Sequence, residues 1–425
     1  MLKINPLSTL YVGIDVSSKS NYVCALDFYK NKYINSSFAN NQPGAEELAL
    51  KILECLKEHP DITTIVAALE STSVYSIHIA NYLSSCEELM RFKPYVFVLN
   101  PKCTANYKKS YIGLGKSDPI DAFVIADFAR AGNIESEPWR GSQFLALKRL
   151  TRHRLHLVEC MTREKTYLVS NLYLKFSQLQ MLEGDDQPFC DIYGATSSSV
   201  LMEYFSPEEI LDSSEEDLIA FLAKKSRNRI KDISKTADLL KKAARDSYRL
   251  DKALYEPLNV SIASSFNCIE TFKREIKVID NAIEKEIKGL NPNAFIILQS
   301  IDGIGPVFAG GIIAEIGDIT AFHSSDALAK YAGLTWKSNQ SGDFDGEDTP
   351  MIKAGNRYLR YYLGEAANSM RKHNVEYGTY YRKKYNEVPK HQHKRALALT
   401  SRKFVRLVYG LLGRCEIFSV NLDLL

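Results

Sequence analysis

Four acidic residues in the first third of the chain have the types and spacing that metal binding requires. Asp15 and Glu70 each lie near the end of a short apolar run of β-forming residues, and Asp118 and Asp121 open a helical pattern three residues apart. Side chains at i and i+3 share one face of a helix. Converging carboxylates repel one another unless cations neutralise them, and Mg²⁺ prefers oxygen ligands. The pattern therefore predicts a site for one or two Mg²⁺ ions, of the kind that activates water in phosphodiester cleavage.

Each of these acids also has a simpler explanation. Asp118 precedes a proline and fits a helix N-cap, where Asp121 would favour the helix dipole. Glu70 fits a plain strand-end residue, and Asp15 fits a cap for the turn that follows it. Asp27, in the neighbouring β-rich run, competes with Asp15 for a role. The joint order of the four acids on strand, strand and helix favours the metal site over separate coincidences.

The elements that must position these acids form an α/β pattern between residues 10 and 130. Three closely spaced β-rich runs with polar turns predict a meander. The order β-β-β-α-β-α-β-α predicts an antiparallel hairpin edge on a partly parallel sheet. In chain order we expect strands at 12–16, 22–29 and 33–38, a helix at 44–58, a strand at 62–69, a helix at 74–83, a strand at 95–99 and a helix opening at Pro119.

This arrangement resembles the ribonuclease H-like nucleases and Holliday-junction resolvases. The segment from Gly115 to Ala122, Gly-Lys-Ser-Asp-Pro-Ile-Asp-Ala, is similar to the second half of the signature of DEDD transposases of the insertion-sequence one-ten family. The resemblance implies a ribonuclease H-like, resolvase-like nuclease domain at residues 8–140. It also implies that Mg²⁺ is bound by a catalytic tetrad of Asp15, Glu70, Asp118 and Asp121.

Residues 141–293 have a helical, charged pattern. Apolar residues recur there at spacings built from three and four, which is typical of a narrow coiled-coil seam. The segment 183–234 predicts a small helical insert with loops. In the family that this chain resembles, a coiled coil serves for dimerisation, so we expect a homo-oligomer, either a dimer or a tetramer. The two apolar stripes are Leu147, Leu150, Leu157, Met161 and Leu168, and Ile262, Phe266, Ile269, Phe272, Ile276, Ile279, Ile283 and Ile287.

The third region, residues 294–416, opens with Gly303-Ile-Gly305-Pro306 between two helical stretches. Glycines in such a hairpin bring backbone N–H groups to the surface, where a phosphate can sit at the helix N-terminus. The turn is similar to a helix-hairpin-helix that contacts DNA through Gly303 and Gly305. The alternative is a glycine turn that only joins two helices.

Three segments further along resemble the C-terminal transposase domain of the same family: Leu328–Thr335, Ser338–Gly342 and Lys353–Arg360. The resemblance implies that Ser341 is a nucleophile that attacks a DNA phosphate and stays covalently joined to the strand, with Ser338 as the weaker candidate. No histidine lies near enough in sequence to serve as its general base. A metal ion or a tetrad carboxylate would have to act instead, in a composite site.

The loop after Ser341 departs from the family pattern. Relatives usually carry basic residues there, whereas this chain has four acids, which would repel phosphate unless they bind metal or point away. A serine in a loop rich in glycine and aspartate is also a common turn residue. The four acids are Asp343, Asp345, Glu347 and Asp348.

Positive charge is concentrated near the C-terminal end. Residues 351–415 contain fifteen Lys and Arg residues and three acids, while the net charge of the whole chain is +3. Tyrosines are interleaved with these cations, which suits phosphate contacts and stacking on bases or sugars. Lys353, Arg357 and Arg360 share one helix side and fit a phosphate-binding role. An ordinary solvated cationic face is the alternative.

The composition excludes several classes of protein. A chain of 425 residues with 45% apolar residues predicts two or three folded domains. The longest apolar window, 295–317, is interrupted by charges, a proline and glycines, so we expect neither a membrane helix nor a signal peptide. Eight scattered cysteines predict neither a disulfide framework nor a zinc site, and they fit a reducing cytoplasm.

The predicted fold class is α/β plus all-α, and the predicted function is a DNA recombinase of the insertion-sequence type. It would cut and rejoin donor and target DNA without a nucleotide cofactor, and the family resemblance adds a structured guide RNA. One alternative is a Holliday-junction-type endonuclease without serine chemistry. Another is an actin-like ATPase or kinase, which also begins with a strand such as Gly13-Ile-Asp15 but needs phosphate and adenosine motifs that have no convincing place here. A DNA-binding protein without nuclease activity is the third.

Overall fold

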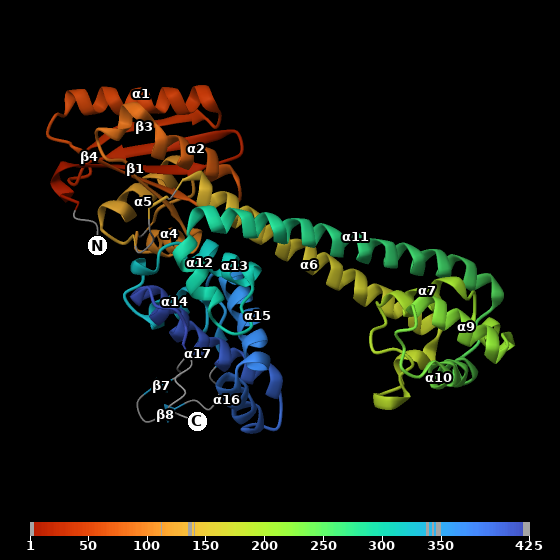
Figure 1. Cartoon of the computed structure of the whole chain (residues 1–425). Coiled ribbons are helices and arrows are strands. Elements are labelled where there is room, and N and C mark those ends of the chain that lie inside the picture. Colours follow the sequence, from red (N-terminus) through yellow and green to blue (C-terminus); the bar gives the residue numbers. More distant parts are fainter. Residues whose placement is uncertain are drawn as a thin grey trace. The chain divides into compact units, whose positions relative to one another are not determined.

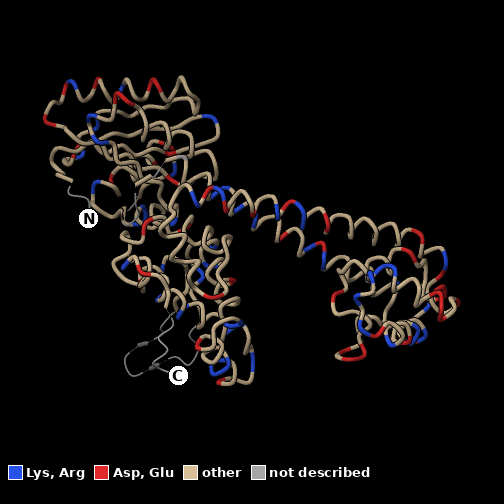
Figure 2. Tube along the Cα trace, in the orientation of Figure 1, with Lys and Arg blue, Asp and Glu red and all other residues tan. Residues whose placement is uncertain are grey.

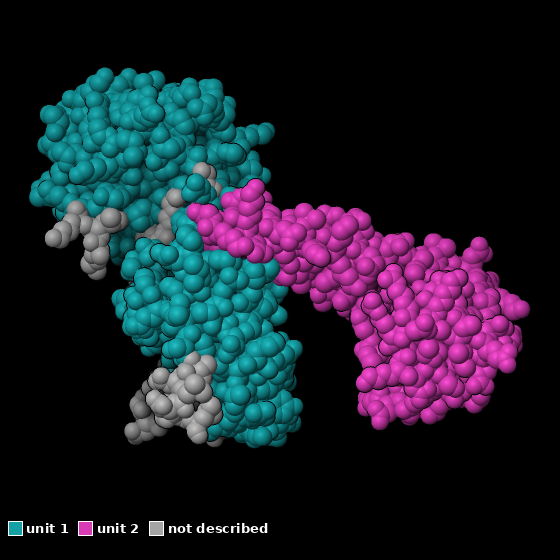
Figure 3. Space-filling model, viewed as in Figure 1, with its two compact units in different colours: residues 1–148, 290–425 teal, residues 149–289 magenta. Residues whose placement is uncertain are grey.

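The computed structural model describes residues 4–111, 113–134, 138–139, 141–336, 340–341, 344–345 and 350–419 (Figure 1). The described part excludes the side chains of residues 142, 340–341 and 344–345. The chain divides into two compact units. Unit 1 is formed by residues 1–148 and 290–425, and unit 2 by residues 149–289 (Figure 3). None of the described helices is long and apolar enough to cross a membrane.

Unit 1 contains a five-stranded sheet with the strand order β3-β2-β1-β4-β5. β2 pairs antiparallel with β1 and with β3, whereas β4 pairs parallel with β1 and with β5. This arrangement confirms the predicted hairpin edge on a partly parallel sheet, and it is compatible with a ribonuclease H-like domain. The strands are β1 (Thr9–Val16), β2 (Ser20–Leu26), β3 (Lys32–Ala39), β4 (Thr64–Glu70) and β5 (Tyr95–Leu99), and a 3-10 turn at Pro6–Ser8 precedes them.

Helices cover both faces of this sheet (Figure 1). α1 and α2 contribute Leu48 and Ile79 to the core on one face, and α5 contributes Ile125 to the core on the other. The sequence pattern does not predict α3 and α4, because both are short and α4 buries only Thr104. The helices are α1 (Gln42–Glu58), α2 (Tyr75–Ser85), α3 (Glu87–Met90), α4 (Pro101–Lys108) and α5 (Asp118–Arg130).

The alternation of side chains along β1 decides which of them meet α5. Even-numbered residues of Leu10–Val16 join the core with α1 and α2, and Tyr11 joins the core with α5. Gly13 lies on the same face as Tyr11. A Cβ at Gly13 would lie 2.2 Å from Ala122 O and 2.3 Å from Ala126 N. The backbone of α5 therefore rests directly on β1, and only glycine permits that approach.

Unit 2 is built on two long helices, α6 (Ser142–Lys175) and α11 (Lys252–Leu290), which lie side by side in Figure 1. Arg154 on α6 forms an ion pair with Asp280 on α11. Lys175, at the end of α6, donates a hydrogen bond to Asn259, near the start of α11. These two contacts show that the helices run antiparallel, because the end of α6 meets the start of α11.

The apolar stripe predicted on α11 is mostly buried. Ile262 and Phe266 share a core with Leu168 and Leu172 of α6. This burial explains the spacing of the stripe within one chain, while a coiled coil between copies of the chain stays a prediction. The buried members of the stripe are Ile262, Phe266, Ile269, Ile276, Ile283 and Ile287, whereas Phe272 and Ile279 are half-buried.

Small helices fill the connection between α6 and α11, as the pattern of the 183–234 segment predicts. Leu201, Leu218, Leu222 and Leu240 from these helices are buried in one core. The helices are α7 (Ala195–Glu203), α8 (Pro207–Asp212), α9 (Glu215–Ser226) and α10 (Ile233–Asp246), preceded by 3-10 turns at Ser177–Gln180 and Gly184–Asp186.

Lys175 is a buried cation at the end of α6, with 2% of its surface exposed. Its Nζ donates to Leu201 O at 2.7 Å, to Tyr204 O at 2.6 Å and to Asn259 Oδ1 at 2.5 Å. Burial lowers the pKa of Lys175 to about 8. The three bonds join the ends of α6 and α7 to the start of α11.

We expect Lys175→Met to lower the free energy of unfolding of unit 2 by about 3 kcal/mol, since a buried acceptor without a donor costs about 1–3 kcal/mol. Urea unfolding followed by circular dichroism measures the change. Lys224→Met, at an exposed position of α9, is the control and should change stability by less than about 0.5 kcal/mol. Equal stabilities of the two variants would show that the three acceptors do not depend on Lys175.

The C-terminal part of unit 1 is mainly helical. A Cβ at Gly311 of α13 would lie 2.3 Å from the ring of Tyr362 on α15, and Tyr362 and Phe404 of α17 are fully buried. The helices are α12 (Pro292–Gln299), α13 (Pro306–Ile316), α14 (Ser325–Ala332), α15 (Arg357–His373), α16 (Val375–Asn386) and α17 (Gln392–Arg414), with a 3-10 turn at Ile319–Ala321. The short strands are β6 (Thr335–Trp336), β7 (Gln340–Ser341), β8 (Phe344–Asp345) and β9 (Met351–Ile352).

Candidate active site

Asp15 and Glu70 meet at one edge of the sheet. In the parallel pair of β1 and β4, Ile14 lies opposite Leu69, so the next residues along the two strands are these two acids. Both lie on the face that α5 covers, because Ala68, two residues before Glu70, belongs to the core with α5, and Gly13, two residues before Asp15, contacts α5. The parallel register thus brings together two carboxylates that are far apart in sequence.

Asp118 and Asp121 come from the first turn of α5. The helix begins at Asp118, and its N-cap is Ser117, whose carbonyl accepts a hydrogen bond from the Asp121 N–H at 2.9 Å. Asp118 therefore does not occupy the N-cap position that the simpler explanation requires. Because Gly13 lets α5 lie directly on β1, the first turn of α5 comes close to Asp15.

The pKa of Asp15 reflects its burial and the charges of the other three acids. Burial raises this pKa, and the negative charges of Asp118, Asp121 and Glu70 raise it further, to about 6. The ammonium group of Lys108 acts in the opposite direction. Converging acids of this kind favour a bound cation, because a positive charge removes their mutual repulsion.

Two side chains on α4 that sequence analysis did not identify contact these acids. Thr104 donates a hydrogen bond from Oγ1 to Glu70 Oε1, and Lys108 donates from Nζ to Asp121 Oδ1. α4 can reach them because Glu70 lies opposite Leu99, the last residue of β5, and α4 follows β5 after one residue. The sequence signal that could have found these contacts is the spacing of Thr104 and Lys108, because residues four apart share one face of a helix and this helix follows β5 directly.

The acids have the chemistry of a divalent-cation site, because they supply only oxygen donors. Among the residues that the structure describes, no three acidic, histidine or cysteine side chains are already gathered to hold a metal ion. Lys108 provides a positive charge to Asp121 instead. The tetrad is therefore an acidic cluster with an internal counter-ion, and Mg²⁺ binding stays a prediction.

Asp27, the competing acid, has a local role. Its Oδ1 accepts a bond from the Asn31 N–H at 2.9 Å, and its Oδ2 accepts from Asn31 Nδ2 at 2.8 Å and from the Tyr33 hydroxyl at 3.0 Å. Burial by itself would raise the pKa of Asp27, but these bonds outweigh it and lower the pKa. Asp27 thus stabilises the turn between β2 and β3.

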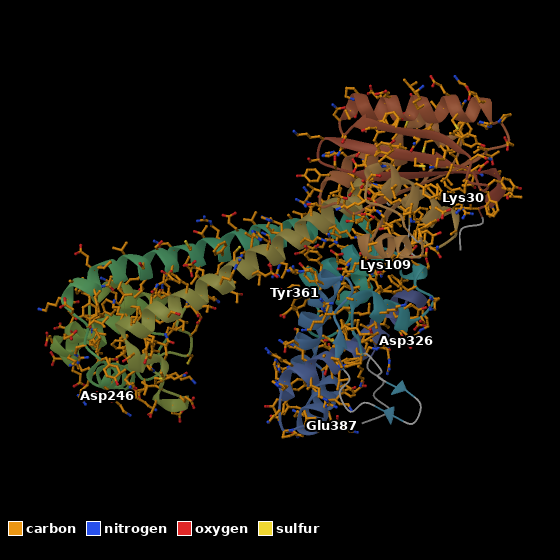
Figure 4. All side chains as sticks on the ribbon, turned by 180° about the vertical axis from the view of Figure 1, so that it is seen from behind. Lys30, Lys109, Asp246, Asp326, Tyr361 and Glu387 are labelled. Atoms are coloured by element: carbon orange, nitrogen blue, oxygen red, sulfur yellow. The ribbon has the colours of Figure 1, made fainter. Side chains whose placement is uncertain are left out.

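Asp127, a residue on α5 that sequence analysis did not identify, is fully buried. Its carboxylate accepts from Arg130 Nε at 2.6 Å, from the Tyr107 hydroxyl at 2.9 Å and from the Tyr111 hydroxyl, and Lys30 Nζ lies 3.2 Å away. Burial would raise the pKa of Asp127, but these partners lower it. Lys30 comes from the turn between β2 and β3 (Figure 4). One buried carboxylate therefore joins α4, α5 and the β2–β3 hairpin.

Gly303 and Gly305 lie in the connection between α12 and α13. Gly303 has a φ of +84°, and its carbonyl accepts a bond from Ser369 Oγ on α15 at 2.7 Å. A Cβ at Gly303 would lie 3.0 Å from His373 Nδ1, so packing against α15 accounts for this glycine. Gly305 is the N-cap of α13, with open space around its Cβ position. A helix-hairpin-helix that contacts DNA through this turn stays a prediction.

The three cations predicted to bind phosphate differ in their surroundings. Lys353 and Arg357 are exposed, whereas Arg360 is half-buried. Arg360 donates from Nη1 to Ala332 O and to Lys353 O, both at 3.1 Å. Burial lowers the pKa of Arg360, and the charge of Arg357 adds to this effect. Figure 2 shows further Lys and Arg residues along the C-terminal helices.

Ser341 lies in β7, which pairs with β8 so that Ser341 is opposite Phe344. The role of nucleophile stays a prediction, and so does the role of the acidic loop. The side chains of Ser341 and Asp345, and Ser338, Asp343, Glu347 and Asp348 as whole residues, lie outside the described part of the chain.

Two family models match the chain. A transposase model of the DEDD type for IS110 elements matches residues 12–177, a range that contains all four tetrad acids. A second model, described as transposase of the IS116/IS110/IS902 family, matches residues 296–382, which contain Ser341 and the three predicted phosphate-binding cations. Together the two models cover more than half of the chain.

Similar proteins are known from several bacterial elements. The chain is 25% identical over 397 residues to an uncharacterized 42 kDa protein of insertion element IS900 from Mycobacterium paratuberculosis, with 93% of each chain covered. It is 24% identical over 422 residues to an uncharacterized 44.8 kDa protein of insertion element IS116 from Streptomyces clavuligerus, with 96% of each covered. A pilin gene-inverting protein of Moraxella lacunata is 26% identical over 160 residues, which are 38% of this chain and 46% of that protein.

Both transposase models and the similarity to proteins of insertion elements define this chain as a DNA transposase or recombinase. It belongs to the IS110 family of transposases.

Proposed function

We propose that the tetrad of Asp15, Glu70, Asp118 and Asp121 binds Mg²⁺ and supports cutting of DNA strands at the ends of an insertion sequence. The observation that carries this proposal is the parallel register of β1 and β4, which places Asp15 beside Glu70, at the end of the sheet where the first turn of α5 brings Asp118 and Asp121. Burial and the charges of these three acids raise the pKa of Asp15 to about 6. Bound Mg²⁺ would stabilise negative charge on phosphate oxygens. Thr104 orients the carboxylate of Glu70, and Lys108 balances the charge of Asp121 before the ion binds.

In the same proposal, Ser341 is the nucleophile of strand exchange. Its Oγ forms a bond to the DNA phosphorus while one bridging oxygen of the strand leaves and takes a proton, and Oγ gives up its own proton. The serine phosphodiester keeps the linkage for rejoining, because a DNA hydroxyl can attack it and release the serine. The match of residues 296–382 to a transposase model supports this assignment.

The roles of the three regions and their binding partners are assigned from the same family. We assign the nuclease role to residues 8–140, coiled-coil contacts between copies to residues 141–293 and the serine chemistry to residues 294–416. Lys353, Arg357 and the turn at Gly303 and Gly305 contact nucleic acid phosphates. A structured RNA selects the DNA, and the protein acts as a dimer or tetramer in the cytoplasm. DNA inversion is the activity named for the Moraxella relative, and it is a reaction of the same cut-and-rejoin kind.

The test of this function is a trap for the covalent adduct. Purified protein, with any RNA that copurifies, is incubated with Mg²⁺ and labelled DNA that carries the flanking sequence of its own gene, and then denatured. We expect wild-type protein to retain labelled DNA, and Ser341→Ala to retain none, because the attacking oxygen is gone. Mass spectrometry of the digested adduct should place the nucleotide on Ser341.

Ser338→Ala is the matched control, since it removes a neighbouring hydroxyl of the same kind, and it should keep the adduct. An adduct that persists in Ser341→Ala would move the nucleophile elsewhere. Nicked DNA without any adduct would favour the endonuclease that lacks serine chemistry. If no nuclease-protected RNA copurifies with the protein, this result would contradict the proposal that a structured RNA selects the DNA.

A further inference from the structure

Ser341 lies in the chain segment between α14 and α15, called here the Ser341 segment, and the two ends of this segment lie next to each other. α14 ends at Ala332, and β6 follows it, while β9 ends at Ile352 and only residues 353–356 separate it from the start of α15. β6 and β9 pair antiparallel, with Thr335 opposite Ile352 and Trp336 opposite Met351. This pair of two-residue strands is too short to hold the two chain ends together by itself. Other contacts must therefore contribute at the base of the segment.

Two glycines let the chain ends approach one another. Gly333 has a φ of +70°, and a Cβ there would lie 2.5 Å from Arg360 Nη1. A Cβ at Gly355 would lie 2.5 Å from Gly333 N and 2.6 Å from Tyr331 O. The contact is thus between backbone and backbone, with a guanidinium group packed against it.

Arg360 connects both chain ends through one nitrogen. Its Nη1 donates to Ala332 O, at the end of α14, and to Lys353 O, directly after β9, both at 3.1 Å. Arg360 is half-buried. A guanidinium group presents several donors in a fixed plane, so it suits a bridge between two carbonyls at fixed positions.

Asn356 makes a second connection at the same base. Its N–H donates to Tyr331 O at 2.7 Å, and its Nδ2 donates to Glu315 Oε2 at 2.7 Å. Glu315 is 1% exposed, so the acceptor of this bond is a buried carboxylate. Asn356 Oδ1 accepts from the Leu359 N–H at 3.1 Å and caps α15. One residue thus connects the start of α15 to α13 through its side chain and to α14 through its backbone.

We propose that Arg360 and Asn356 are positioning residues for strand exchange, which hold the base of the Ser341 segment, and that Arg360 is not a phosphate ligand. This inference rests on the proposed role of Ser341. A nucleophile must be held close to its attack geometry, and a displacement of about 1 Å can cost on the order of a hundredfold in rate. Residues that fix both ends of its segment therefore act on the rate rather than on DNA affinity.

Arg360→Lys separates the two roles, because lysine keeps the charge but its side chain ends one bond short of the position of Nη1, the nitrogen that bridges the two carbonyls. For a positioning role, we expect the rate of adduct formation at saturating DNA to fall on the order of a hundredfold. The Kd for DNA and its salt dependence should stay as in the wild type. Asn356→Asp keeps the cap of α15 but loses the donor to Glu315, and it should show the same pattern.

For a phosphate ligand, Arg360→Met would lower the slope of log Kd against log salt by about 0.9 and leave the rate at saturating DNA unchanged. That pair of results would overturn the proposal, and so would a wild-type rate in Arg360→Lys. Arg357→Met is the comparison for a true phosphate contact, since Arg357 is exposed one turn away. It should lower the slope by about 0.9.

Hydrogen exchange tests the base of the segment without the reaction. The amides of Trp336 and Ile352 in the β6–β9 pair should exchange about tenfold faster in Arg360→Met than in the wild type, while thermal melting confirms that the variant folds. Unchanged exchange in a folded variant would contradict the proposal. A wild-type protein that forms no Ser341 adduct would contradict the proposed nucleophile, and the exchange result would still decide whether Arg360 holds the segment.

Discussion

Asp15→Asn is expected to reduce Mg²⁺-dependent cleavage of DNA by on the order of a thousandfold, because a metal-held charge contributes several kcal/mol to the transition state. Asp15 is the acid on which the effects of Asp118, Asp121 and Glu70 converge. The measurement is the rate of nicking of a plasmid that carries the flanking DNA of the gene. Chelation of metal by EDTA should reduce wild-type cleavage to the same level.

The same substitution should raise the melting temperature of the metal-free protein at pH 8. The pKa of folded Asp15 is about 6, above its ordinary value of 3.8, so the folded state binds this proton more tightly than the unfolded chain does. Stability from this group is therefore present at low pH and falls as pH rises from about 4 through 6. Asparagine carries no charge and avoids that loss. Calorimetry in EDTA at pH 5 and pH 8 measures the difference.

If Asp15→Asn melts at a higher temperature and has lost cleavage, Asp15 serves the reaction at a cost to stability, whereas loss of a structural acid would lower the melting temperature. Asp27→Asn is the matched control, because Asp27 lies in the turn between the neighbouring strands β2 and β3, where its carboxylate accepts hydrogen bonds from Asn31 and Tyr33. It should keep wild-type cleavage and lose about 1 kcal/mol of stability. Cleavage by Asp15→Asn at the wild-type rate would contradict the proposal that the tetrad binds Mg²⁺ for DNA cleavage.

Gly13→Ala is also expected to reduce cleavage, although it removes no charge. Its new Cβ would lie 2.2 Å from Ala122 O and 2.3 Å from Ala126 N, and neither backbone atom can give way unless α5 moves. We expect a loss of about 2–3 kcal/mol in the free energy of unfolding from overpacking. Moving α5 also moves Asp118 and Asp121 away from Asp15, so cleavage should fall on the order of a hundredfold.

Gly115→Ala is the control for this substitution, since a Cβ at Gly115 meets no atom within 4 Å. Its stability should differ from the wild type by less than about 1 kcal/mol. Chemical unfolding of both variants, followed by circular dichroism, gives the comparison. Similar stabilities of Gly13→Ala and Gly115→Ala would show that α5 does not rest on β1 as described.

The N-terminal sheet could be predicted because its signals are local. Each strand is a short apolar run between polar turns, and the run at 95–99 coincides with β5. The order of these runs, together with the rule that parallel strands need a crossover, limits the sheet to few topologies. α4 lacks such a signal, because it is eight residues long and buries only Thr104. A short helix of this kind is held by its neighbours rather than by its own periodicity.

The roles of single charged residues were predicted less well, since a sequence shows charge but not the partner. Arg360 fits a cationic helix side as well as Arg357 does, yet Arg360 bridges two carbonyls and Arg357 is exposed. Asp27 and Asp15 are both acids in β-rich runs, but Asp27 bonds within its own turn. Asp127 has no sequence signal at all, although it collects partners from three elements.

The sequence by itself determined the order of the five N-terminal strands and of the longer helices between them, the acids at 15, 70, 118 and 121, and the resemblance to a transposase family. These features depend on residue types and spacings along one chain. Only the tertiary structure decided that Gly13 lets α5 lie on β1, that Lys108 neutralises Asp121, and that Arg360 joins the ends of the Ser341 segment. Each of these is a contact between residues on different elements, and its partner is set by packing rather than by spacing.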